Sequence, residues 1–177
     1  MDNTKTARLY STWHSPGSAN DLANARKWKA VGFERDMFFA TLALLKNRTP
    51  VVEENQVLRN AVIESAIIHA RNLCCIFLSV PSRERGEILL RDLTSTWEQD
   101  PERAKLIRLL EKAFFQDPVN GATVFDAFSE RITYAVDRRG DAENYSYAAE
   151  FVAINGLVKA IVENLEATLN ARSTPDR

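Results

Sequence analysis

Five polar residues inside one strongly apolar stretch, 57–80, have the types and spacing that suit chemistry. They are Asn60, Glu64, His69, Arg71 and Asn72. A carboxyl group and an imidazole are the usual pair in general acid–base catalysis, and a guanidinium group binds anions. Burial also shifts such groups toward their neutral forms. The carboxyl, imidazole and guanidinium groups are therefore candidate catalytic residues, and the two asparagines are candidate binding residues.

The same residues also fit a purely structural role. Asn60, Glu64 and Arg71 are four and seven residues apart, so on a helix they lie within about 40° of one another and form one polar stripe. A buried carboxylate without a partner costs roughly several kcal/mol. We expect Glu64 to pair with Arg71, to pair with an arginine of another helix, or to keep its proton. A network satisfied in this way fixes the register of a helix without catalysis.

A second polar group lies farther along the chain, spaced i, i+3 and i+7 with one more arginine beside it. Its members are Arg131, Tyr134, Arg138 and Arg139. Several guanidinium groups near a phenol suit the binding of a phosphate. The alternative is a solvated cationic edge that pairs with Glu130 and Asp137. Both interpretations stay open at this point.

Other kinds of site lack their sequence patterns. The chain has two histidines, His14 and His69, and neither has the spacing of a zinc site. There is no glycine-rich phosphate loop and no Gly-x-Ser-x-Gly motif. We therefore expect no metal and no cofactor.

The element that must position the five polar residues is a buried helix. Apolar side chains cover most of the circumference of 57–80 at 100° per residue. Thr49 is the expected N-cap and Pro50 the expected first residue, so the central helix spans about 50–80 and ends before Pro81. Three ionisable groups within 61–80, the longest candidate membrane span, argue against a transmembrane helix.

Four other segments with helical spacing are predicted to pack around this helix. They are 18–47, with a kink at Gly32, 101–114 after the N-cap Asp100, 124–139, and 145–171. The segment 82–99 fits either a short helix or a loop with one helical turn. No segment has strand periodicity. The prediction is an all-α, single-domain bundle of five or six helices over 18–172, with no strand.

The first seventeen residues show no periodicity and are predicted to form a mobile tail, 1–17. Tyr10, Trp13 and His14 are unusual in such a segment. They fit either a loosely docked arm or a segment that docks to a partner.

Charge and cysteine content bear on the partners and the cellular compartment of the protein. Lysine and arginine number 23 against 24 aspartates and glutamates, with alternating signs, so the charge does not support a nucleic-acid partner. Cys74 and Cys75 are adjacent on one helix, where their side chains diverge by about 100°. We interpret them as reduced thiols. Together with the absence of a basic and apolar leader, this predicts a cytoplasmic protein that does not enter a membrane.

The segment 64–73, which holds four of the five polar residues, resembles a helix of small uncharacterised bacterial all-helical proteins that are distantly similar to the HEPN superfamily. The match covers this helix and, loosely, 132–139. HEPN nucleases cleave RNA with an arginine followed four to six residues later by a histidine, paired across a dimer. The resemblance implies a helical bundle and a dimer. No arginine stands four to six residues before His69, and we take the motif to be missing from the chain. Ribonuclease activity is therefore not expected.

The expected function is a non-catalytic helical interaction module of a bacterial or phage-like cytosolic system. Its partner would be another protein or a second copy of the chain. The apolar stripe of 145–171, from Phe151 to Leu169, is predicted to leave one side open for a homodimer. Two alternatives stay open: a divergent HEPN-like nuclease that uses the three candidate catalytic residues, and a helical bundle that binds a small ligand.

Overall fold

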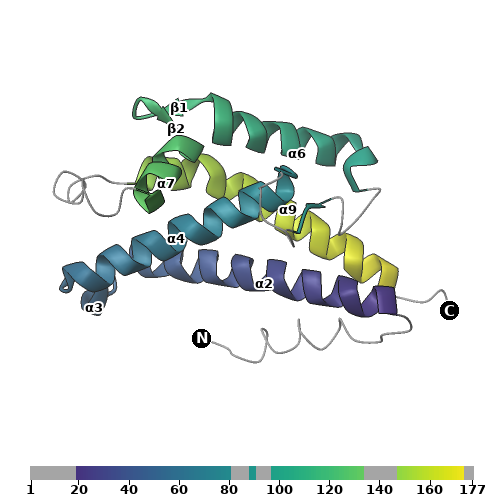
Figure 1. The fold of residues 1–177 in the computed structure, drawn as a ribbon, viewed down its shortest axis with the longest axis horizontal. Helices are drawn as coiled ribbons and strands as arrows, with labels where there is room; N and C mark the ends of the chain where they lie inside the picture. Colours follow the sequence, from purple (N-terminus) through teal and green to yellow (C-terminus); the bar gives the residue numbers. More distant parts are fainter. Residues whose placement is uncertain (1–18, 81–87, 91–96, 134–146, 174–177) are drawn as a thin grey trace.

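The computed structural model describes residues 19–80, 88–90, 97–133 and 147–173. Within these ranges six α-helices form one bundle (Figure 1), which confirms the predicted all-α class. The predicted tail 1–17 lies outside the described residues. Of the helices described, none is long and apolar enough to cross a membrane.

The predicted central helix is in fact two helices. Residues 50–80 contain α3 (Pro50–Glu53) and α4 (Gln56–Phe77). Asn55 separates them, because its backbone is extended and its side-chain oxygen accepts the N–H of Leu58 at 3.1 Å. This contact is a helix N-cap. The central helix therefore begins at Gln56, and the proline at position 50 begins only the short α3.

A left-handed turn ends α4 before the proline that was expected to end it. Ser79 has a φ of 50°, and its N–H binds the carbonyl oxygen of Ile76 at 3.2 Å. The N–H groups of Leu78 and Val80 also return to carbonyl oxygens of the last turn. Such a turn satisfies carbonyl groups that a helix end leaves unpaired. The helix thus stops at Phe77.

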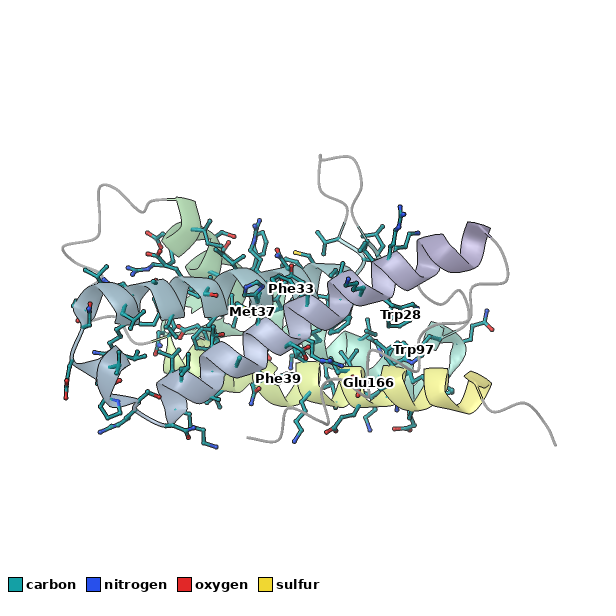
Figure 2. All side chains as sticks on the ribbon, turned by 90° about the horizontal axis from the view of Figure 1, so that it is seen from below. Trp28, Phe33, Met37, Phe39, Trp97 and Glu166 are labelled. Atoms are coloured by element: carbon teal, nitrogen blue, oxygen red, sulfur yellow. The ribbon has the colours of Figure 1, made fainter. Side chains whose placement is uncertain are left out.

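The other helices surround α4 on several sides (Figure 1). α2 (Ala19–Lys46) runs beside α4, and α7 (Val124–Thr133) packs on another side of it. α9 (Ala148–Ser173) runs obliquely to α2 in the view of Figure 2, and α6 (Pro101–Glu111) packs against α9. α2 is one unbroken helix through Gly32, where a kink was expected.

Asp100 caps α6 as predicted. Its side chain accepts the N–H groups of Glu102 and Arg103 at 3.0 and 3.1 Å. A 3₁₀ turn, η1 (Trp97–Gln99), precedes α6, and a π-helical turn, η2 (Lys112–Gln116), continues it. Of the segment 82–99, the structure describes only this 3₁₀ turn and residues 88–90.

One small hairpin contradicts the prediction of no strand. β1 (Pro118–Val119) pairs with β2 (Ala122–Thr123) in an antiparallel ladder. Asn120 and Gly121 connect the two strands with φ angles of 53° and 90°. A two-residue turn with positive φ at both positions favours Asn-Gly, so the sequence carried a hairpin signal that strand periodicity could not reveal.

The core contains large aromatic as well as aliphatic side chains. The aromatic residues that are 0 % exposed are Phe38, Phe77, Trp97, Phe114 and Phe128. Burying each such side chain contributes about 1.5–3 kcal/mol. Two apolar residues of α2, Phe33 and Leu44, are 54 % and 38 % exposed and so lie outside this core.

Candidate functional site

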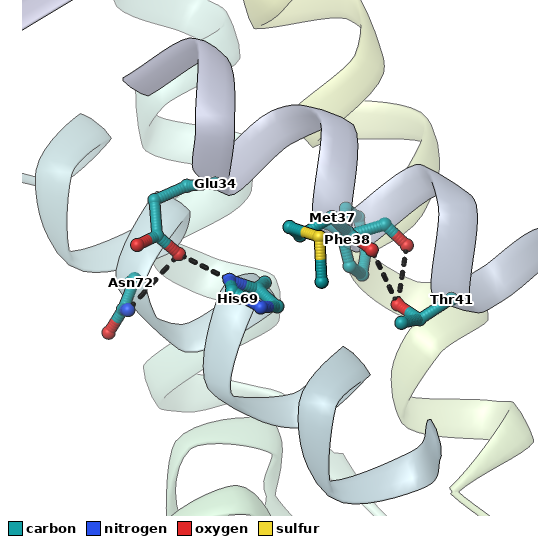
Figure 3. Close-up of polar contacts among 6 residues, drawn as sticks. All are labelled: Glu34, Met37, Phe38, Thr41, His69 and Asn72. Atoms are coloured by element: carbon teal, nitrogen blue, oxygen red, sulfur yellow. Dashed lines mark hydrogen bonds and ion pairs between the residues drawn. The ribbon is translucent and has the colours of Figure 1, made fainter. Parts of the chain in front are cut away.

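The imidazole of the central helix is held by a carboxylate of α2 (Figure 3). Nδ1 of His69 lies 2.6 Å from Oε2 of Glu34, and the side-chain nitrogen of Asn72 donates to the same oxygen at 3.1 Å. The side chains of His69 and Glu34 are 12 % and 20 % exposed. An ionised carboxylate only accepts hydrogen bonds, so it orients the ring with Nδ1 as the donor. Two predicted site residues thus meet a third that was not predicted.

Neighbouring contacts fix this cluster between α2 and α4. The ring of Phe33 stands edge-on to His69, with 5.6 Å between ring centroids. About two turns farther along α2, the buried hydroxyl of Thr41 lies 2.8 Å from the carbonyl oxygen of Met37 and 2.9 Å from that of Phe38 (Figure 3). Glu34, His69, Asn72 and Thr41 therefore have partners inside the protein.

The carboxylate of Glu64 pairs with an arginine of another helix, which is one of the three predicted outcomes. Its Oε1 lies 3.4 Å from Nη2 of Arg131 on α7. The arginine side chain is only 7 % exposed, so its interpretation as a solvated cationic edge is wrong. α7 turns this side chain toward α4 and its carboxylate. Tyr134, Arg138 and Arg139, the other members of the predicted phosphate-binding group, lie outside the described residues.

The remaining polar residues of α4 have other neighbours. The guanidinium carbon of Arg71 lies 5.6 Å from the ring centroid of Phe125, a cation–π arrangement. The side-chain oxygen of Asn60 accepts a hydrogen bond from Gln56 at 3.0 Å. Glu64, His69 and Arg71 thus each contact a different side chain, and these contacts do not join them into one site.

Two further polar residues of interest lie at the start of α9. Glu150 is 0 % exposed, and its Oε1 accepts a hydrogen bond from the side chain of Asn120 at 3.2 Å. Burial raises the pKa of the Tyr147 phenol above its ordinary value, and the positive charge of Arg131 offsets part of that rise. The charge of Arg131 on α7 therefore acts on the phenol of Tyr147, the residue before α9.

The two cysteines are free thiols. Burial raises the pKa of the Cys74 thiol well above its ordinary value, and the neighbouring Cys75 adds to the rise. A thiol in that state is a poor nucleophile. Among the described residues, no three His, Cys, Asp or Glu side chains gather closely enough to hold a metal ion.

An open groove of about 1190 Å³ lies on a different part of the molecule, between α2, α9 and the beginning of α4. We call it the α2–α9 groove. Its apolar lining includes Phe39, Leu42 and Leu45 of α2, Ile63 of α4, and Phe151 and Val152 of α9. Figure 2 shows Phe39 where the two long helices cross.

An ion-pair cluster links the two walls at one end of this groove. Arg35 of α2 pairs with Glu166 of α9 and, at 2.7 Å, with Asp36 of its own helix. Toward the beginning of α9 the wall is open, and Val152 is 78 % exposed. The groove is therefore bounded at the ion-pair end and open toward the end of α2.

The apolar stripe of α9 does not provide the open face that was predicted for a dimer. Its members Phe151, Ile154, Val158, Ile161 and Leu165 are all buried within the chain itself. The exposed part of α9 is a neighbouring side, which lines the groove. The predicted open face is therefore not found in the described part of the stripe, and the dimer itself stays a prediction.

Sequence reasoning missed Glu34 and the groove. A usable signal for Glu34 was present, because this carboxylate stands among the apolar residues Phe33, Met37 and Phe38. A charge in such a segment calls for a partner. The groove had no comparable signal, since it depends on the angle at which α2 and α9 cross.

Comparison of the chain with known protein families, with curated proteins and with solved structures finds no match. The similarity to HEPN proteins therefore stays a prediction that these comparisons do not test.

Proposed function

We propose that this protein is a non-catalytic interaction module whose α2–α9 groove receives an amphipathic helix of a partner protein. The observation that supports this most strongly is the groove itself, which is open, about 1190 Å³ in volume and largely apolar in its lining. Sites for small molecules commonly enclose about 300–1,000 Å³. The larger volume favours a segment of protein over a small ligand.

The walls of the groove suit a helix. Two helices that diverge from a crossing point leave space between their ridges, and a third helix fills such space by packing its own apolar side chains into it. Binding of an amphipathic helix in an apolar groove is a common mode of peptide recognition. The partly exposed Leu45 and exposed Val152 provide apolar surface that a partner would remove from water.

The contacts of α4 support a non-catalytic role. Glu64 and His69 are engaged by Arg131 and Glu34, and these pairs join helices to one another. We also propose, from the resemblance of 64–73 and from the free thiols, that the module acts in the cytoplasm of a bacterial or phage-like system.

Site-specific photo-crosslinking in cells tests the groove. A photoreactive residue at position 152 lies in the groove, and one at position 109 on α6, where Leu109 is 43 % exposed, provides the matched control. We expect position 152 to capture a peptide with apolar residues spaced i, i+3, i+4 and i+7. A synthetic copy of that peptide should bind the purified protein, and Val152→Glu should weaken binding while Leu109→Glu does not.

Equal capture at the two positions would contradict the proposal. So would a captured peptide that does not bind the purified protein. A small ligand as the natural occupant would leave no peptide adduct at position 152.

A ribonuclease is the second candidate, and two observations favour it. The carboxylate of Glu34 on Nδ1 of His69 is the arrangement that orients a general base. Moreover, Arg8 stands six residues before His14, which is the HEPN spacing. The motif is therefore absent before His69 but present at Arg8 and His14, so the expectation that the chain lacks it is wrong. Arg8 and His14 lie outside the described residues. RNA cleavage that is lost in folded His69→Ala or His14→Ala variants would establish this candidate.

A further inference from the structure

The charges around the α2–α9 groove are unevenly distributed. At the end of α2, three cations stand against one carboxylate: Lys46, Arg48, Arg59 and Glu53. All four residues are exposed. The pair between Arg59 and Glu53 is long, at 4.0 Å, and within the described residues neither Lys46 nor Arg48 has an ion-pair partner. We call these three cations the basic end of the groove.

The opposite end has the reverse balance and is internally paired. Arg35 lies between Asp36 and Glu166, and Lys159 pairs with Glu163 at 3.8 Å. Three carboxylates there face two cations. Arg35 and the basic end are separated by about eleven residues of α2, or roughly 16 Å at the rise of an α-helix.

The backbone at the basic end is also unusual. Arg48 has a φ of 45°, in the left-handed region that glycine or asparagine occupies at lower cost. An arginine at this position directs a cation toward the groove that Arg48 lines.

We propose that the groove selects a partner helix that carries acidic side chains at one end, and that this end binds at Lys46, Arg48 and Arg59. The inference rests on the proposed function, because it specifies the chemistry of the helix that the groove receives. Apolar side chains of the helix cover the walls, and its carboxylates meet the three cations of the basic end. The ion-pair cluster around Arg35 marks the other end, so the charges set the direction in which the helix lies.

Three designed peptides test this selection on the full-length protein. They share one amphipathic helical sequence of Leu, Ala and Gln, and they end in three Glu, three Gln or three Lys residues. Fluorescence anisotropy at low salt should show the Glu peptide binding roughly tenfold tighter than the Lys peptide, since exposed ion pairs are individually weak and add modestly. The difference should shrink as salt screens the charges.

Variants of the protein with reversed charges complete the experiment. The Lys46→Glu, Arg48→Glu double variant should lose the preference for the Glu peptide and gain one for the Lys peptide. Lys105→Glu with Arg108→Glu, at exposed cations of α6, changes the net charge equally and should leave the preference intact.

The outcomes separate the two proposals. If all three peptides bind with equal affinity and Val152→Glu weakens each of them, the groove binds helices and the inference about charge is wrong. If the α6 variant changes the preference as much as the groove variant, the effect is one of net charge, and the inference is again wrong. If no peptide binds, both the proposed function and this inference are contradicted.

Discussion

The side chains of the polar face of α4 contact neighbouring helices, whereas those of the α2–α9 groove line open space. On α4, Glu64 and His69 reach partners on neighbouring helices at 3.4 and 2.6 Å. In the groove, apolar side chains such as Phe39 and Val152 line open space. The residues whose types best suit chemistry thus contact side chains of neighbouring helices. In the proposed function, apolar residues of the kind that usually form a core are the ones that a partner contacts.

The largest expected effect on stability is at the ion pair of α4. Glu64→Ala leaves the buried guanidinium of Arg131 without its carboxylate and should destabilise the protein by about 3 kcal/mol. Arg131→Met should cost less, because the Glu64 side chain is 32 % exposed and can be hydrated. Urea denaturation measures both free energies of unfolding.

The double variant sharpens this test. If the two residues interact, Glu64→Ala with Arg131→Met costs less than the sum of the single changes. Strict additivity would show that the pair is not coupled. The exposed carboxylate of Glu111 is the control, since Glu111→Ala should stay within about 0.5 kcal/mol of the parent.

A smaller effect is expected where α2 meets α4. Glu34→Gln weakens a charged hydrogen bond to His69 but preserves the shape of the side chain, so it should cost about 1–2 kcal/mol. The same measurement on His69→Ala and on the double variant gives the coupling between the two residues. A change below about 0.3 kcal/mol in Glu34→Gln would mean that this contact does not hold the helices together.

Alkaline pH provides a third test, at the start of α9. Because burial raises the pKa of Tyr147, the folded protein holds this proton more tightly than the unfolded chain does. Stability should therefore fall as the pH rises past the ordinary phenol pKa of 10.0. Tyr147→Phe should remove part of that fall, as followed by urea denaturation between about pH 8 and pH 11. An identical slope in both proteins would place the phenol in a solvated environment.

The smallest effect on stability is expected in the groove. Val152 is 78 % exposed, so Val152→Glu should change the free energy of unfolding by no more than about 0.5 kcal/mol. Thermal and urea denaturation check this. A large loss would mean that Val152 belongs to the core and that the groove is closed in solution.

The helices and their buried faces could be predicted from the sequence because helical periodicity is a local property. The stripe from Phe151 to Leu165 and the cap at Asp100 are examples, and both are found. The break at Asn55 and the Asn120-Gly121 turn also depend on local sequence, but other features of the sequence indicated a different structure there. A nearby proline suggested a different helix start, and a two-residue strand is too short to show alternation.

The partners of the polar residues could not be predicted, because they depend on how separate helices meet. The sequence indicated that Glu64 pairs with Arg71, pairs with an arginine of another helix or keeps its proton, and only the packing of α7 against α4 selects Arg131. The same limit applies to Glu34 and His69, which are separated by 35 residues. The groove is set by the crossing of α2 and α9 and has no sequence pattern of its own.

The most direct test of the account compares one variant from each region in the same binding measurement. The peptide captured at position 152 is titrated into the parent protein, Val152→Glu and His69→Ala, each shown to be folded by circular dichroism. The account predicts at least a tenfold loss of affinity in Val152→Glu and a change of less than about twofold in His69→Ala. Unchanged affinity in Val152→Glu together with a large loss in folded His69→Ala would contradict it and would place the functional site at the polar face of α4.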